Sequence, residues 1–172
     1  MITRLIKHDD LDLSSIADPN AHATRHNRGG ADSLDYTLIA QLFDSGDVSC
    51  DIGTGGSPTR STVYSLPPNW TNLIPLAIYM EIGGTVATDE TITISVKVVL
   101  DDDSEYEVAS YSLTGSTGSK IENAPFQGLL TALRSAGATK DGRRITSIVA
   151  DVSSSASSTS ATATVRVIGI RT

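Results

Sequence analysis

The segment Thr91–Leu100 reads TITISVKVVL, and it decides the fold class of this 172-residue chain. Its apolar residues recur at every second position, with hydroxyl or lysine side chains at three positions between them: Ile92, Ile94, Val96, Val98 and Leu100 alternate with Thr93, Ser95 and Lys97. Because successive side chains of a strand point to opposite faces, this period of two predicts a β-strand with one buried face.

Further strands are predicted on both sides of this segment. Leu73–Ile82 is apolar at nearly every position, which is typical of a strand buried on both faces or covered by an N-terminal arm. Glu105–Leu113 changes the phase of its apolar residues, which a β-bulge near Val108 explains. Two β-branched segments, Ile145–Val152 and Thr162–Ile170, are expected to pair as a hairpin. Three weaker patterns predict additional strands at Val48–Gly53, Arg60–Leu66 and Ser119–Glu122.

Glycine, aspartate and serine separate these segments at positions where the chain must turn. The predicted turns are Gly83–Gly84, Asp101–Ser104, Gly115–Gly118 and Ser153–Ser160. The last of them is rich in serine and contains no core-forming residue, so we expect a mobile hairpin loop there.

One helix is predicted among the strands, and a second is predicted in the N-terminal arm. In the first, Asn123 is the N-cap, Pro125 lies in the first turn, and Gly137 ends the helix after leucines at helical spacing. The second spans Leu34–Phe43, with Asp32 as its cap.

This pattern predicts a mainly β fold: an antiparallel β-sandwich, jelly-roll-like, with one short α-helix and an extended N-terminal arm. An immunoglobulin-like sandwich is the alternative topology. The predicted division is an arm or linker over residues 1–45 and a β-sandwich domain over residues 46–172.

Charge and composition exclude several classes of partner. The net charge is −7, whereas nucleic-acid binding needs clustered lysine and arginine, so we expect no nucleic-acid partner. No apolar run approaches the roughly 18–20 residues of a membrane span, and we expect neither a membrane partner nor a secretion signal. Cys50 is the single cysteine, which excludes an intramolecular disulfide and favours a small core residue.

An enzyme is not expected. The three histidines, His8, His22 and His26, all lie within the first 30 residues, so a catalytic triad in the β domain lacks its base. The glycine-rich stretch Gly53–Ser57 lacks the lysine of a phosphate-binding loop and is interpreted as a turn.

One acidic stretch is a candidate metal site. Asp101, Asp103, Glu105 and Glu107 are two residues apart and point the same way if the stretch continues a hairpin. Oxygen donors suit calcium, so a structural calcium ion is the possible cofactor. The alternative is a solvated acidic turn that discourages edge-to-edge aggregation.

The arm contains the most distinctive pattern of the sequence, which begins at His22 and ends at Leu34: HATRHNRGGADSL. His22 and His26 with Asp32 could hold a transition metal, but Gly29 and Gly30 favour a fixed turn in an irregular backbone. The residues predicted to form an assembly arm are His22, Arg25, His26, Gly29, Gly30, Asp32, Leu38, Ile39, Leu42 and Phe43.

This pattern, His-x-x-x-His-x-x-Gly-Gly-x-Asp, resembles a segment of tail-fibre, appendage and decoration proteins of bacteriophages and archaeal viruses. The match covers 13 residues. The resemblance implies a virion structural role, often in homo-oligomers, in which such a segment precedes or links β-rich modules. It implies no catalytic activity.

The leading hypothesis is therefore a virion structural protein that acts by self-assembly, as a tail, fibre, capsid or decoration component. Its partners are copies of itself and other structural subunits, and it is assembled in the host cytoplasm. In the arm, Leu38–Phe43 is apolar enough to add a strand to a neighbour's sheet. The alternatives are a subunit of an extracellular filament or tube built by donor-strand exchange, and a carbohydrate-binding β-sandwich.

Overall fold

The computed structural model describes residues 40–125, 128 and 143–172, and within them the chain is mainly β. No helix in this part is long and apolar enough to cross a membrane. The strands are β1 (Gln41–Asp44), β2 (Val48–Cys50), β3 (Thr59–Ser65), β4 (Leu73–Leu100), β5 (Glu105–Thr117), β6 (Lys120–Pro125), β7 (Ile145–Ser154) and β8 (Ser160–Arg171).

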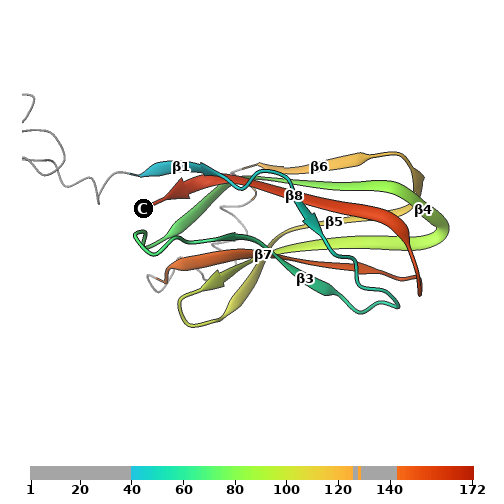
Figure 1. Cartoon of the computed structure of the whole chain (residues 1–172), viewed down its shortest axis with the longest axis horizontal. Helices are drawn as coiled ribbons and strands as arrows, with labels where there is room; N and C mark the ends of the chain where they lie inside the picture. The colour runs from blue at the N-terminus through green and yellow to red at the C-terminus, as the bar shows by residue number, and fades with distance from the viewer. Residues whose placement is uncertain (1–39, 126–127, 129–142) are drawn as a thin grey trace, which may run out of the picture. The chain divides into compact units, whose positions relative to one another are not determined.

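Strand β4 belongs to two layers, because its two parts have different partners. Residues 73–85 pair with β8 and residues 77–82 also pair with β6, whereas residues 91–100 pair with β5 and β7. Gly84, near the end of the first part, has a φ of +76°, and beyond it the strand turns back on itself at the right-hand end of Figure 1. We call the layer of β1, β2, β8, the first part of β4 and β6 sheet I. Sheet II contains β3, β7, the second part of β4 and β5.

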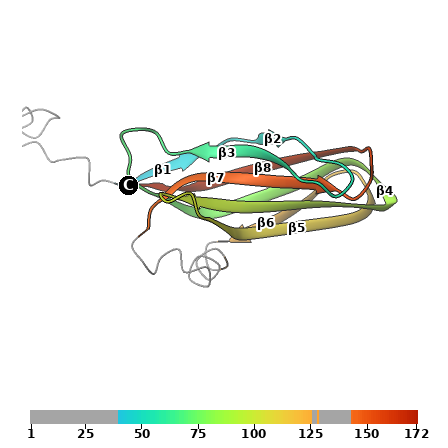
Figure 2. The same cartoon turned by 90° about the horizontal axis from the view of Figure 1, so that it is seen from below.

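The two sheets have matching strand orders, which defines the topology. Sheet I runs β1 and β2, β8, β4, β6, and sheet II runs β3, β7, β4, β5. From β2 to β8, successive strands alternate between the sheets except where β4 is followed by β5, and β1 and β2 both belong to sheet I. Figure 2 shows sheet II in front, with sheet I behind it. This is the jelly-roll arrangement of an antiparallel sandwich, as the sequence predicts.

The core lies between the sheets and confirms the alternation of Thr91–Leu100. Its fully buried side chains come from inward positions of both parts of β4 and from β7 and β8: Ile78, Met80, Ile82, Ile92, Ile94, Val96, Val98, Ile148, Val152, Val165 and Val167. Cys50 is also buried, as predicted for a small core residue. The bulge predicted near Val108 is present, since Val96 pairs with Ala109 and Lys97 with Glu107.

Several local predictions are wrong. Gly83–Gly84 does not end a strand, because both residues continue the pairing of β4 with β8. The segments Ile145–Val152 and Thr162–Ile170 do not form a hairpin, because they lie in opposite sheets and pair with opposite parts of β4.

Parts of the two helix predictions are also wrong. Asn123 and Pro125 lie in β6 instead of beginning a helix, whereas Gly128 is helical as predicted, and residues 126–127 and 129–137 of the predicted helix lie outside the described residues. Gln41–Phe43, predicted as the end of the helix Leu34–Phe43, lies in β1. Tertiary pairing with β4 and β8 overrides the local helical spacing in both places.

The serine-rich connection between β7 and β8 includes a buried group. Ser154 is completely buried, and its Oγ donates a hydrogen bond of 2.6 Å to Glu90, which is 3% exposed. This bond and a second hydrogen bond, from the side chain of Thr159, lower the pKa of Glu90. The prediction that the segment holds no core residue is therefore wrong for Ser154, which joins the tip to β4.

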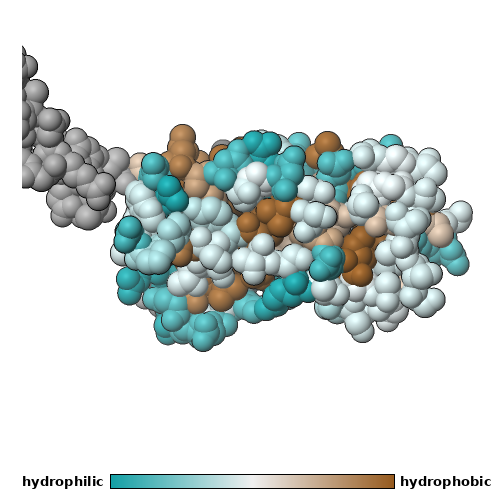
Figure 3. Space-filling model, in the orientation of Figure 1, coloured by the Kyte–Doolittle hydropathy of each residue, from teal (hydrophilic) through white to brown (hydrophobic). Residues whose placement is uncertain are grey.

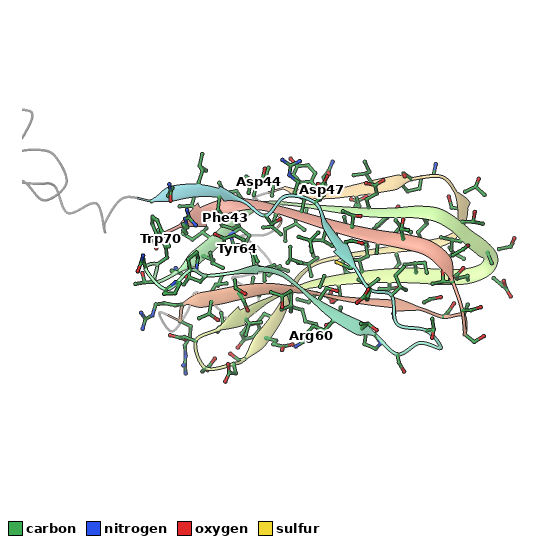
Figure 4. All side chains as sticks on the ribbon, in the orientation of Figure 1. Phe43, Asp44, Asp47, Arg60, Tyr64 and Trp70 are labelled. Atoms are coloured by element: carbon green, nitrogen blue, oxygen red, sulfur yellow. The ribbon has the colours of Figure 1, made fainter. Side chains whose placement is uncertain are left out.

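The open edge of the sandwich is closed by aromatic packing. Phe43 of β1 stacks on Tyr64 of β3 with ring centroids 4.1 Å apart, so an edge strand of each sheet contributes one ring (Figure 4). Phe43 lies opposite Gly169 of β8, where the absence of a side chain leaves room for the ring. Arg171 donates to the Tyr64 hydroxyl and lies 4.8 Å from the centre of the Trp70 ring.

We expect Gly169→Ala to lower the free energy of unfolding by about 1–3 kcal/mol, the usual range for overpacking. A Cβ at residue 169 would lie 2.5 Å from the Ile74 carbonyl oxygen and 2.6 Å from Cε1 of Phe43. Urea denaturation followed by tryptophan fluorescence measures the change. Gly83→Ala is the matched control, since its Cβ meets the rotatable Thr162 hydroxyl at 2.8 Å and so costs less. Equal losses in the two variants would contradict the role of Gly169.

Candidate functional site

The outer face of sheet II is polar, and its side chains bond to one another. The hydroxyls of Thr91 and Thr114 lie 2.7 Å apart, and those of Thr93 and Ser112 lie 2.9 Å apart across the same strand pair. The Ser95 hydroxyl donates to Glu107. Because these side chains form hydrogen bonds within the sheet, their polar groups are satisfied without a binding partner.

A network of charges continues this face across all four strands of sheet II. Arg60 of β3 donates two hydrogen bonds to Asp151 of β7, at 2.8 and 2.9 Å, and two more to Glu105 of β5. Lys97 of β4 contacts Asp151 at 2.5 Å. Figure 4 shows Arg60 on the lower side of the sandwich. Hydrogen bonds from Arg60 lower the pKa of Asp151 to about 2.

The outer face of sheet I is different, because it exposes large apolar side chains. Leu42 of β1 is 69% exposed, Ile121 of β6 is 61% exposed and Tyr79 of β4 is 38% exposed. The pairing of Leu42 with Ile170, of Tyr79 with Arg166 and of Ile121 with Glu81 places all three on this one face. Separate groups of brown apolar atoms reach the upper margin of Figure 3, where sheet I lies, with teal hydrophilic atoms between them.

A hollow of about 440 Å³ lies on this face beside the exposed residues. Three large, mainly apolar side chains line it, Tyr79, Ile121 and Ile168. The other lining residues are the hydroxyl residue Thr164 and the charged residues Asp47, Glu81 and Arg166. The lining residues come from the β1–β2 connection and from β4, β6 and β8.

The charges at the hollow are unequally paired. Arg166 donates to both carboxylate oxygens of Asp44, at 2.9 and 2.5 Å, and lies 3.8 Å from Asp47. The hydrogen bond from Arg166 lowers the pKa of Asp44. Glu81 forms no ion pair with any residue in the described part of the chain. The rim of the hollow therefore carries an excess of negative charge.

The acidic residues proposed as a calcium site have separate partners. Asp101 lies 3.5 Å from Arg144, and Glu105 and Glu107 bond to Arg60 and Ser95, respectively. Asp103 occupies the turn, with a φ of +63°. Among residues 40–125, 128 and 143–172, no three His, Cys, Asp or Glu side chains form a group suited to a metal ion. Calcium binding here stays a prediction.

Only two residues of the predicted assembly arm are described. Leu42 is exposed on the outer face of sheet I, whereas Phe43 is buried beneath Tyr64 in its own chain. Both lie in β1, which pairs with β8 of the same chain. The other predicted residues lie outside the described part of the chain: His22, Arg25, His26, Gly29, Gly30, Asp32, Leu38 and Ile39.

Sequence reasoning missed the residues around the hollow as functional candidates. Tyr79, Ile121 and Arg166 belong to no motif, and only the pairing of three strands brings them together. One signal did exist: Leu73–Ile82 is apolar on both faces, and its inner side is buried while Tyr79 on the outer side is exposed.

Comparisons with known proteins place the chain in no family. No family model and no curated protein matches it. Among solved structures, it resembles the VP2 subviral particle of infectious bursal disease virus at 13% identity, with a TM-score of 0.37, over 81% of this chain and 34% of that chain. The T13 particle of the same virus gives 13% identity and a TM-score of 0.37, over 83% and 33%. The chain thus spans about a third of the length of these proteins, and similarity at this level carries no functional conclusion.

The charge network predicts a loss of stability in acid. Because folding lowers the pKa of Asp151 from 3.8 to about 2, its ionised form stabilises the folded chain above pH 4 by about 2 kcal/mol. This contribution is lost as the pH falls from about 4 through 2. Urea unfolding at pH 5, 3 and 2 measures it, with Asp151→Asn as the control that should lose less stability over this range. The same pH dependence in both proteins would refute the assignment to Asp151.

Proposed function

We propose that this chain is a structural subunit of a virus particle and acts by self-assembly. One observation carries the proposal: the large exposed apolar side chains of the described residues, Leu42, Tyr79 and Ile121, gather on one face of the sandwich. The opposite face pairs its hydroxyls and charges internally. A binding partner would therefore cover exposed apolar side chains on sheet I, whereas on sheet II it would meet polar groups that are already paired.

The physical reason is the free energy of apolar surface in water. Removing it from water stabilises a complex by about 25 cal/mol per Å², and contiguous apolar patches on a soluble protein mark interaction sites. On this face the exposed Leu42 and Ile121 lie on the edge strands β1 and β6, with Arg166 and Glu81 on the strands between them. Protein–protein interfaces likewise combine apolar contacts with hydrogen bonds and charged residues such as arginine. A subunit that assembles through sheet I would bury this surface.

The assignment to a virus particle rests on the arm pattern His22–Leu34 together with the jelly-roll arrangement, which occurs in capsid proteins but also in lectins and cupins. Fold alone does not determine function, so the arm resemblance distinguishes the virion from the other uses. On this proposal the partners are copies of this chain and other virion subunits, and assembly takes place in the host cytoplasm.

The test is the mass of the full chain in solution, measured by light scattering over a range of concentrations. We expect a discrete oligomer or a polymer, and we expect Ile121→Lys to reduce the mass per particle. Ser110→Lys is the matched control, because it adds the same charge to an exposed position on the outer face of sheet II. A monomer at high concentration, or an equal effect of both variants, would contradict assembly through sheet I.

A second candidate is sugar binding, and the hollow is the observation that favours it. Tyr79 offers an aromatic face beside Asp47, Glu81 and Arg166, the kinds of group that stack on sugars and bond to their hydroxyls. Retention on polysaccharide resins, with loss of retention in Tyr79→Ala, would favour this function over assembly.

A further inference from the structure

We propose that the hollow on sheet I binds the N-terminal segment Met1–Lys7 of a second copy of this chain. The inference rests on the proposed function and deepens it, because it names the partner of the exposed face. The hollow offers both an apolar and an acidic component, and the segment MITRLIK offers the complement of each.

The apolar component is formed by Tyr79, Ile121 and Ile168, which line the hollow from three neighbouring strands. The volume of the whole hollow, about 440 Å³, falls in the range of pockets that enclose a small ligand, about 300–1,000 Å³. The segment carries Ile2, Leu5 and Ile6, spaced i, i+3 and i+4. That spacing is the one with which short peptides insert apolar anchors into a groove.

The acidic component is formed by carboxylates that outnumber their cationic partners. Asp44, Asp47 and Glu81 lie at or beside the hollow, and Arg166 is the cation among its lining residues. The segment contains Arg4 and Lys7, and its first acidic residue is not reached until Asp9. Because opposite charges across an interface raise the association rate and select the correct partner, this complementarity favours the segment over an uncharged apolar peptide.

The length of the intervening chain permits contact with a neighbour. Residues 8–39 separate the segment from the described domain, and a chain of this length has an r.m.s. span of about 30 Å when flexible and reaches about 100 Å when extended. A segment bound in another copy links two chains by unlike surfaces. Such head-to-tail contacts generate closed rings or open filaments, as a structural subunit requires.

The test is a reversal of charge in the full chain. Arg4→Glu with Lys7→Glu, and separately Asp47→Lys with Glu81→Lys, should each raise the concentration needed for half-assembly at least tenfold, as measured by light scattering. The chain that carries all four substitutions has its charges exchanged and should assemble near the original concentration. Failure of this rescue, with both pairs of variants folded by circular dichroism, would overturn the inference.

Disulfide trapping identifies the copy that supplies the segment. A chain with Leu5→Cys is mixed with a chain with Ile121→Cys and oxidised, while Cys50 stays buried in both. We expect a covalent dimer of unlike chains, and far less of it when Ser110→Cys replaces Ile121→Cys. Absence of this dimer, together with a bond that forms within a single chain carrying both Leu5→Cys and Ile121→Cys, would overturn binding between copies.

The two proposals fail in different ways. If the full chain assembles and Ile121→Lys weakens assembly, but Arg4→Glu with Lys7→Glu changes nothing, sheet I is an interface and the N-terminal segment is not its partner. If the full chain is a monomer at every concentration, the proposed function itself fails.

Discussion

Strand β4 holds the sandwich together, because its two parts supply a central strand to each sheet. The first part pairs with β6 and β8 and the second with β5 and β7, so a single segment makes hydrogen bonds in both layers. Its inward residues, from Ile78 to Val98, belong to one buried cluster. The sheets therefore cannot separate without breaking either this strand's pairing or the core between them, and every surface of the domain is positioned relative to β4.

The same strand accounts for the contrast between the two outer faces. In its second part the outward residues are Thr91, Thr93, Ser95 and Lys97, which bond across to β5 and β7. In its first part the outward residues include Tyr79 and Glu81, which have no such partners in the described structure and face the hollow. Polar groups that already have hydrogen-bond partners gain little free energy from a binding partner. Exposed apolar side chains are stabilised by apolar contact, and an unpaired carboxylate is stabilised by a cation. The chemical difference between two halves of one strand thus separates a solvated face from a candidate interface.

The sequence was sufficient for features that depend on neighbouring residues and insufficient for those that depend on distant ones. The period of two in Thr91–Leu100 predicts its buried face, and the phase change around Val108 predicts a bulge, because both are properties of one strand. The pairing of Ile145–Val152 could not be predicted, since a hairpin and a crossing between sheets have the same local pattern. Asn123 and Pro125 begin a helix by local preference, yet pairing with β4 places them in β6. The hollow was beyond prediction for the same reason: Tyr79, Ile121 and Arg166 meet only through long-range pairing.

The pairing of β1 with β8 has a consequence for the order of events during synthesis. Gln41 and Arg171 are 130 residues apart in the chain and bond to each other, and Phe43 lies over Gly169. Of the described strands, β8 leaves the ribosome last, so β1 has no neighbour and Phe43 has no site until translation has passed residue 169. The edge of sheet I is therefore completed only in chains translated this far, and truncated products keep an exposed aromatic ring that chaperones and proteases can recognise.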